Sequence, residues 1–320
     1  MSAPTGGGDD SRAPRRPSAP SPRWTIGPHE PLALDQPRIL AIVNVTPDSF
    51  SDGGELPTPA AAAERMLRAQ SDGAAIIDMG GESTRPGAAR IDESEQIRRI
   101  VPALRAARAA GLAIPVSIDT TRAAVARAAL DEGAAIINDV SAGVEDPAIL
   151  ELAARRGSGL ILMHRLRPPD ADSYSDRYTA PPAYPESAGG VVGVVRTFLS
   201  ERVEAARAAG VNDSQIVLDP GLGFGKAVAD NLLLARSILD VGSVAGAHFP
   251  VLSAASRKSF LSPGAGDAPR DRDAQTLACS VVHALMGVRL FRVHDVRAHA
   301  RALRTAALLA PAAHSRFTAL

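Results

Sequence analysis

Residues 39–54 read ILAIVNVTPDSFSDGG, an apolar run that passes directly into a polar, turn-forming segment. The run at 39–43 does not alternate with polar residues, which is typical of parallel strands covered by helices. The segment behind it carries Asn, Thr, Asp and Ser as well as Gly and Pro, more polar side chains than a tight turn needs. A buried strand that opens into a polar loop is where α/β proteins usually carry their chemistry.

The chain repeats this unit, with helix-spaced stretches rich in Ala, Arg and Glu between apolar runs. The expected strands are residues 38–43, 74–79, 114–118, 134–138, 158–163, 215–218, 249–253 and 288–293. The expected helices include residues 58–72, 93–110, 121–132, 191–209 and 271–287. Strands that alternate with helices predict parallel βαβ units, and eight units in roughly 285 residues suit a (β/α)8 TIM barrel. A doubly wound open sheet is the alternative, but no GxGxxG follows the first strand.

Composition bounds the domain organisation and the partners. The chain has 320 residues, 45% of them hydrophobic, and can bury a large core. Residues 1–35 are rich in Pro, Ser, Gly and Arg without an apolar signal segment, so we expect a disordered tail followed by one barrel domain at 36–315. The 35 basic and 35 acidic residues cancel, which argues against nucleic-acid and membrane-surface partners. One cysteine, Cys279, and no apolar run of membrane-spanning length suit a cytoplasmic protein.

Polar side chains follow the expected strands at the end where a barrel carries its active site. In chain order they are Asn44, Asp78, Asp119, Asn138-Asp139, Met163-His164, DPGLGFGK at 219–226, SRKS at 256–259 and RVHD at 292–295. Each one alone has an ordinary explanation as a turn, a helix N-cap or a surface ion pair. Their recurrence at the same end of eight strands predicts a pocket.

The residue types divide this pocket into two halves. Acceptors for paired N–H donors, such as an aminopyrimidinone edge, are Asp78, Asp119, Asp219 and Asn138. Cations suited to phosphate or carboxylate are Arg85, Lys258, Arg292 and His294. Neither a P-loop nor a Cys/His zinc pattern is present, whereas Mg²⁺ shared between Asn44 and a substrate phosphate is compatible with the sequence. These residues predict an enzyme for a phosphate-bearing nitrogen heterocycle and leave its reaction open.

Seven motifs resemble those of dihydropteroate synthase, the folate-pathway enzyme inhibited by sulfonamides. They are NVTPDSFSDGG (44–54), IIDMGGESTRPGA (76–88), SIDT (117–120), IIND (136–139), LDPGLGFGK (218–226), SRKSF (256–260) and RVHD (292–295). The resemblance implies a (β/α)8 barrel that joins 4-aminobenzoate to 6-hydroxymethyl-7,8-dihydropterin diphosphate and releases pyrophosphate. It also implies Mg²⁺ as cofactor and, most often, a homodimer.

The resemblance further implies roles for individual residues. The pterin contacts would be Asp119, Asn138, Asp219 and Lys258. The diphosphate contacts would be Asn44, Thr84, Arg292 and His294, with Asn44 also the metal ligand. The 4-aminobenzoate contacts would be Phe50, Pro86, Phe224 and Ser259. Catalysis would rest on Asp119, Lys258 and Arg292, through positioning and charge stabilisation, because a neutral arylamine needs no strong base.

The chain departs from the family pattern in two places near the expected pocket. After Met163-His164, where a Gln-Gly pair is usual, it reads RLRPP and stays proline-rich to about residue 185. Ala254 stands where a glycine is usual, next to the expected pterin site.

Two other functions fit a pterin-binding barrel. A pterin-binding methyltransferase-type barrel would lack the paired substrate-closing loops and SRKS. A non-catalytic pterin-binding paralogue would have lost part of GGESTRPG, SRKS or RVHD. All of these segments are present.

Overall fold

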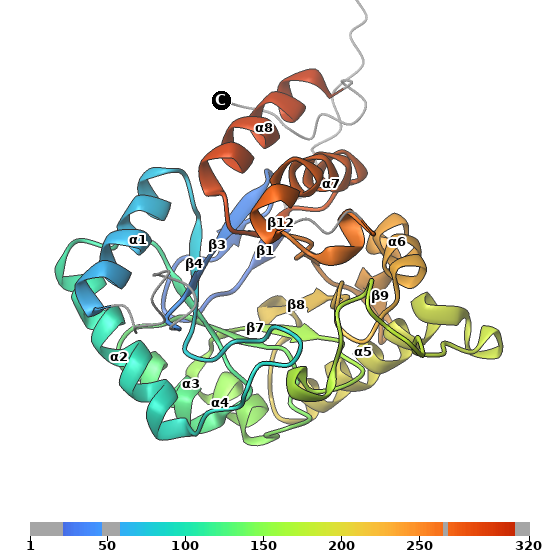
Figure 1. Cartoon of the computed structure of the whole chain (residues 1–320). Coiled ribbons are helices and arrows are strands. Elements are labelled where there is room, and N and C mark those ends of the chain that lie inside the picture. Colours follow the sequence, from blue (N-terminus) through green and yellow to red (C-terminus); the bar gives the residue numbers. More distant parts are fainter. Residues whose placement is uncertain (1–21, 47–57, 265–267, 311–320) are drawn as a thin grey trace, which may run out of the picture.

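The computed structural model describes residues 22–46, 58–264 and 268–310. Within them, eight parallel strands form one sheet, and helices lie around it (Figure 1). In sheet order the strands are β11 (Leu252–Ser253), β12 (Leu290–Val293), β3 (Arg38–Asn44), β4 (Ile76–Gly80), β5 (Val116–Asp119), β6 (Ile136–Asp139), β7 (Gly159–Met163) and β8 (Ile216–Asp219). The larger helices are α1 (Pro59–Ser71), α2 (Glu93–Ala109), α3 (Ala123–Asp131), α4 (Ala148–Arg156), α5 (Gly190–Ala208), α6 (Val228–Arg236), α7 (Asp273–Met286) and α8 (Val296–Leu309).

The sheet closes into a barrel at its weakest seam, between β8 and β11. There a single parallel bridge joins Leu218 to Val251, and the Leu218 N–H donates to the Pro250 carbonyl oxygen at 2.9 Å. Because Pro250 has no N–H to continue a ladder, the strand expected at 249–253 is reduced to the two residues of β11. The expected (β/α)8 barrel is confirmed, nearly closed on this side.

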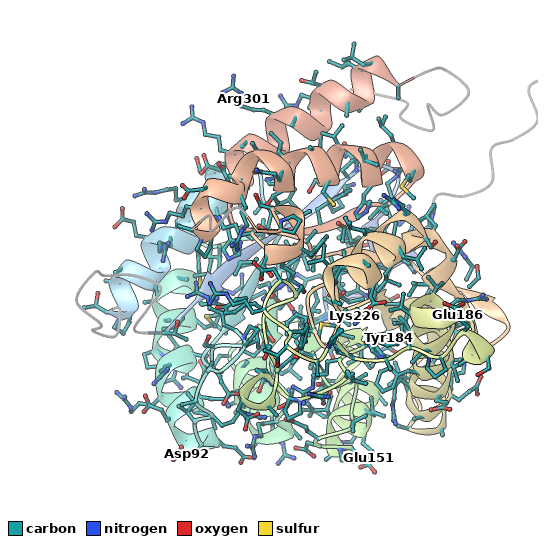
Figure 2. All side chains as sticks on the ribbon, turned by 45° about the vertical axis from the view of Figure 1, so that its right-hand side comes forward. Asp92, Glu151, Tyr184, Glu186, Lys226 and Arg301 are labelled. Atoms are coloured by element: carbon teal, nitrogen blue, oxygen red, sulfur yellow. The ribbon has the colours of Figure 1, made fainter. Side chains whose placement is uncertain are left out.

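The helices begin where short polar side chains or proline favour a first turn. Thr58 accepts a hydrogen bond from the Ala61 N–H at 3.2 Å, and Pro59 follows it at the first helical position of α1. Asp92 caps α2 in the same way, accepting from Glu95 N–H at 2.8 Å. Charged side chains such as Asp92, Glu151 and Arg301 lie on the outside of the molecule (Figure 2), whereas Lys226 is fully buried. No helix among the described residues is long and apolar enough to span a membrane.

An N-terminal hairpin closes the opposite end of the barrel from the polar loops. Its strands β1 (Arg23–Trp24) and β2 (Leu32–Ala33) pair antiparallel. Trp24 is completely buried among residues from the first half of the barrel strands, and its Nε1–H donates to the Gln215 carbonyl oxygen at 2.7 Å. Gly159 makes room for it, since a Cβ there would lie 3.1 Å from the indole ring.

The domain boundary expected at residue 36 is therefore too late. Residues 22–35 belong to the folded domain, because the chain's single tryptophan and Ile26 complete its core. The polar composition around these two residues concealed them. The expected end of the domain at residue 315 lies outside the described residues.

Truncating the chain tests this boundary. Deleting residues 2–30 removes Trp24, and loss of a buried tryptophan side chain costs about 3–5 kcal/mol, which lowers Tm by about 10 °C for a domain of this size. Deleting residues 2–21 leaves the hairpin in place and should not change Tm. Calorimetry of both truncated proteins distinguishes them, and equal melting temperatures would contradict a structural role for the hairpin.

Candidate active site

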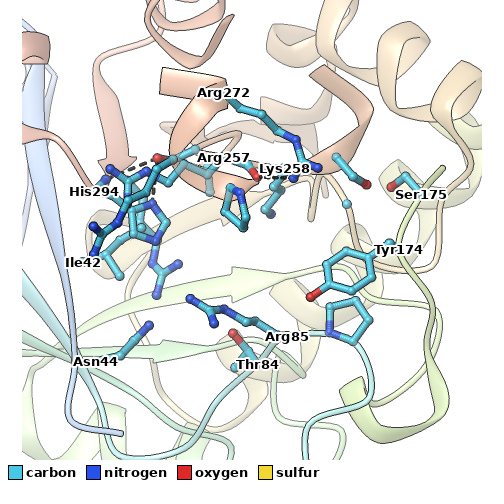
Figure 3. A pocket seen from close by; sticks show the side chains of 18 of the residues that line it. Ile42, Asn44, Thr84, Arg85, Tyr174, Ser175, Arg257, Lys258, Arg272 and His294 are labelled. Carbon is cyan, nitrogen blue, oxygen red and sulfur yellow. Dashed lines mark hydrogen bonds between the residues drawn. The ribbon is translucent and has the colours of Figure 1, made fainter. Parts of the chain in front are cut away.

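The loops at the carboxyl ends of the strands surround a cavity of about 550 Å³ (Figure 3). Nine residues that the sequence singled out line it: Asn44, Thr84, Arg85, Pro86, Phe224, Lys258, Ser259, Arg292 and His294. They come from β3, from the loops after β4, β8 and β11, and from the end of β12. Ala254 also lines the cavity. Phe50, the remaining residue expected at the 4-aminobenzoate end, lies outside the described residues.

The other three expected residues, Asp119, Asn138 and Asp219, end strands β5, β6 and β8 and are buried, with exposures of 6%, 2% and 3%. The Asn138 Nδ2 group donates to both carboxylate oxygens of Asp78, at 3.2 and 3.3 Å. Oδ1 of Asp119 and Oδ1 of Asn138 have no hydrogen-bond partner among the described residues. Buried acceptors in proteins are normally paired, so this pair of oxygens is suited to a ligand that brings N–H donors.

Arg292 connects the acceptor residues to the cavity. Its Nε donates to Asp78 Oδ2 at 2.6 Å, and its Nη2 donates to Asp119 Oδ2 at 2.7 Å. Burial raises the pKa of the Asp119 carboxyl, with Arg292 opposing the shift and the nearby Asp78 carboxylate adding to it. The guanidinium thus holds two buried carboxylates close together that would otherwise repel each other.

Lys258 joins the SRKS loop to the GLGFGK loop. Its Nζ donates to the Leu222 carbonyl oxygen and lies 4.4 Å from the centre of the Phe224 ring, a cation–π contact. Burial lowers the pKa of Lys258 to about 8, and the Asp219 carboxylate opposes the shift. Gly223 is required here: it has φ +81°, and a Cβ would lie 2.7 Å from Lys258 Cδ.

His294 is held as a neutral hydrogen-bond donor. Burial and the surrounding cations, Arg257 and Arg292 foremost, hold its pKa well below the usual value. Ser256 Oγ accepts from the His294 backbone N–H at 3.2 Å and lies 2.9 Å from Nδ1. This contact fixes the orientation of the neutral ring, and which of the two atoms donates depends on the tautomer.

Lys226, at the end of the GLGFGK motif, has a role that motif reading alone missed. It is fully buried and donates to the carbonyl oxygens of Gly221 at 2.9 Å and Phe224 at 3.0 Å, with His164 Nδ1 as its third acceptor at 2.9 Å. Burial lowers the pKa of Lys226 to about 7 and the pKa of His164 to about 2. The lysine fixes the loop that carries Phe224. The sequence feature that could have indicated this role is a single lysine at the end of a glycine-rich turn.

More arginines line the cavity than the sequence predicted, and the segment after β7 also contributes lining residues. Its additional lining residues include Arg65 on α1, Arg257, Arg270 and Arg272 after β11, and Tyr174 and Ser175 after β7. Arg257 is paired with Asp273 through two hydrogen bonds of 2.7 and 2.8 Å. Tyr174 and Ser175 belong to the segment that departs from the family pattern, so no family motif could predict their place in the cavity.

The donor set suits a cation that arrives with a phosphate. The described residues contain no group of three or more His, Cys, Asp and Glu side chains arranged to hold a metal. Asn44 contributes one neutral amide at the cavity wall. Mg²⁺ often takes one or two protein ligands and fills its shell with phosphate oxygens and water, so this arrangement fits it.

Replacing Arg292 by Met should destabilise the protein in a pH-dependent way. Removing one partner of a buried charge pair costs about 3–5 kcal/mol. Asp119 already has a pKa above its ordinary value, and without the guanidinium this pKa rises further. The folded state then binds a proton more readily than the unfolded state, so stability lost at pH 8 is partly regained as pH falls to 5.5.

Urea unfolding of the parent and Arg292→Met at both pH values measures this difference. Arg270→Met, which removes an exposed arginine from the cavity rim, is the matched control. If Arg292→Met lowers the free energy of unfolding by the same amount at pH 8 and pH 5.5, the arginine does not compensate the charge of the buried carboxylates.

Known proteins resemble this chain in both sequence and fold. A family model described as pterin binding enzyme matches residues 40–294. The dihydropteroate synthase of Mycobacterium leprae is 43% identical over 284 residues, 85% of this chain and 93% of that protein. The Synechocystis enzyme is 40% identical over 273 residues, 84% of this chain and 88% of that protein.

Solved structures of dihydropteroate synthases have the same fold as this chain. The Xanthomonas albilineans dihydropteroate synthase with 4-aminobenzoic acid superposes with a TM-score of 0.77 at 38% identity, covering 91% of this chain and 100% of that one. The same enzyme with 7,8-dihydropteroate gives 0.74 at 36% identity, with the same coverage. With the family model and these relatives spanning most of its length, the chain belongs to the pterin-binding enzymes and, among them, to the dihydropteroate synthase family.

Proposed function

We propose that the protein joins 4-aminobenzoate to 6-hydroxymethyl-7,8-dihydropterin diphosphate, giving 7,8-dihydropteroate and pyrophosphate in folate biosynthesis. One observation carries the proposal beyond family membership: unpartnered buried acceptors at the strand ends are joined through Arg292 to a cavity that is lined by a cluster of cations. A pterin carries N–H donors at one end, and its diphosphate carries negative charge at the other. The two ends of the substrate therefore match the two halves of the site.

The pterin end would rest on the buried strand ends. The 2-amino group and ring N–H of a pterin form a donor pair suited to a carboxylate, and Asp219 provides one that is 3% exposed. The backbone N–H of Gly221 already donates to Asp219 Oδ1 at 2.7 Å and holds its orientation. The unpartnered oxygens of Asp119 and Asn138 would accept the remaining ring donors. The charge of Lys258 opposes the rise in the pKa of Asp219 that burial causes.

The diphosphate end would use side chains that present only donors toward an anion. The guanidinium of Arg292 is such a group, the neutral His294 ring would be another in the tautomer with the proton on Nε2, and Thr84 and Asn44 line the same cavity. Holding the negative charge of the leaving group lowers the barrier for its departure. The bond between the pterin methylene carbon and oxygen breaks, and its electron pair leaves with pyrophosphate.

The carbon–nitrogen bond then forms from the lone pair of the arylamine, which loses a proton afterwards. The amine is already neutral near pH 7, so the residues need to orient it rather than deprotonate it. Asp119, buried beside Arg292, would stabilise positive charge on the methylene carbon while the bond changes. Phe224 and Pro86 line the part of the cavity available to the aromatic ring, together with Ser259.

We also propose Mg²⁺ as the cofactor, entering with the diphosphate. Asn44 would supply its protein ligand, and substrate oxygens and water would supply the others. When bound, the cation would neutralise charge on the departing pyrophosphate. We place the enzyme in the cytoplasm, where its one cysteine stays a thiol, and expect sulfonamides to compete with 4-aminobenzoate.

Turnover is the direct test. The protein with Mg²⁺, dihydropterin diphosphate and 4-aminobenzoate should release pyrophosphate, and omission of any one component should stop release. Asp219→Asn replaces an acceptor by a donor at the pterin edge and should weaken pterin diphosphate binding by on the order of 1–3 kcal/mol. Asp176→Asn, an exposed change, is the control.

Calorimetry measures the binding of pterin diphosphate, and the pyrophosphate assay measures turnover. Binding of the diphosphate without turnover would identify the non-catalytic paralogue instead of a synthase. Methyl transfer from a folate without pyrophosphate release would identify the methyltransferase-type barrel.

We further propose a homodimer formed through the outer face of α7 and α8. These helices pack together (Figure 1) and expose large apolar side chains: Val282, Leu285, Met286, Leu308 and Leu309. A patch of this kind on a monomer is usually covered by a partner, and the resemblance favours a second copy.

Light scattering tests the dimer. The parent should have twice the mass of one 33.1 kDa chain, and Val282→Asp should shift it toward a monomer. Val144→Asp, at a position 55% exposed in the loop before α4, should not. A parent of one chain's mass would refute the proposal.

A further inference from the structure

The segment after β7, residues 164–189, forms a wall of the cavity and is here called loop 5. Apart from the short 3₁₀ turns Pro169–Ala171 and Glu186–Ala188 it has no regular structure. Nevertheless Tyr174 and Ser175 reach the cavity lining from it. This is the segment whose sequence departs from the family pattern.

Loop 5 is fixed to the neighbouring loop that carries Phe224. The buried Asp172 accepts from the Gly225 N–H through Oδ2 at 2.7 Å, and the Tyr184 hydroxyl donates to the Gly225 carbonyl oxygen at 2.5 Å. The buried Ser175 hydroxyl accepts from Asn231 Nδ2 at 3.0 Å. Lys226, which follows Gly225 and is labelled near Tyr184 in Figure 2, holds the same loop through the Phe224 carbonyl oxygen.

Loop 5 is also fixed on its other side, to the loop that carries Thr84 and Pro86. The Gly87 N–H donates to the Pro169 carbonyl oxygen at 2.8 Å. Arg165 at the start of loop 5 pairs with Glu145, which also receives both terminal nitrogens of Arg90 at 2.9 Å each. These contacts on both flanks hold Tyr174 between the two loops that surround the aromatic end of the cavity.

The orientation of the acceptor substrate decides which of its atoms Tyr174 can reach. The amine must point inward, because the reacting methylene carbon belongs to the pterin held over the buried strand ends. The carboxylate, at the opposite end of the ring, then points outward to the cavity mouth. Tyr174 is half-buried there, and Figure 3 shows its hydroxyl directed toward the side of the cavity that carries Arg85.

We propose that Tyr174 is a specificity-determining residue whose hydroxyl donates a hydrogen bond to the carboxylate of 4-aminobenzoate, next to the positive charge of Arg85. The inference rests on the proposed synthase activity and adds to it a contact that selects anionic arylamines. A phenol donor and a guanidinium together favour a carboxylate over a neutral group of the same size.

The test compares two acceptors, 4-aminobenzoate and 4-methylaniline, by pyrophosphate release at saturating pterin diphosphate; the methyl group carries no charge and accepts no hydrogen bond. Tyr174→Phe should raise KM for 4-aminobenzoate by on the order of tenfold to a hundredfold, the loss of one hydrogen bond to a charged group. Its KM for 4-methylaniline and its KM for pterin diphosphate should stay within about twofold of the parent values. Thr179→Ala, a hydroxyl removed from an exposed position of the same loop, should change none of them.

Each outcome separates this inference from the proposed function. A parent protein without pyrophosphate release would refute the synthase activity and the Tyr174 contact with it. A parent that turns over, with an unchanged 4-aminobenzoate KM in Tyr174→Phe, would overturn the inference alone. Equal increases for both acceptors and for pterin diphosphate would likewise overturn it, since they would reveal a structural role.

Discussion

The bridge from Arg292 to Asp78 and Asp119 is the interaction on which the site depends. Asp78 and Asp119 come from the consecutive strands β4 and β5, whereas Arg292 comes from β12, near the other end of the chain. Two buried carboxylates that share one partner repel each other unless a cation lies between them. The sheet from β12 to β5 must therefore be curved for the charged centre to assemble.

The bridge also explains why some buried oxygens at the strand ends have hydrogen-bond partners and others have none. Asn138 and Arg292 occupy both oxygens of Asp78, and Arg292 occupies Oδ2 of Asp119, which leaves Oδ1 of Asp119 and Oδ1 of Asn138 without partners among the described residues. An unmet buried acceptor costs about 1–3 kcal/mol. The next residue, Asp139, shows the contrast, because its carboxylate accepts from the N–H groups of Ser141 and Gly143 at 2.7 and 2.6 Å. Asp139 stabilises its loop, whereas Asn138 remains available to a ligand.

Sequence alone predicted the strands, most helices and the residues at the strand ends, because burial on both faces and loop chemistry are local signals. It could not predict contacts that join distant segments without a repeating pattern. Trp24 hydrogen-bonds to Gln215, 191 residues away, and a lone tryptophan in a polar stretch has no periodicity to reveal it. The Asp172 contact with Gly225 spans 53 residues, and the fully buried Lys226 contradicts the usual exposure of lysine.

The two ends of the cavity differ in how they are held. The proposed pterin end consists of residues at the ends of strands, whose positions are set by the ladder and by buried charges, so a change there disturbs the barrel itself. The proposed arylamine end consists of loops that hold one another through side-chain and backbone hydrogen bonds, and one of these loops departs from the family pattern. A site built on strands fixes geometry, and a site built on loops tolerates sequence change. Recognition of the acceptor can therefore vary in this chain while the reacting centre is kept, and loop 5 is where that variation is concentrated.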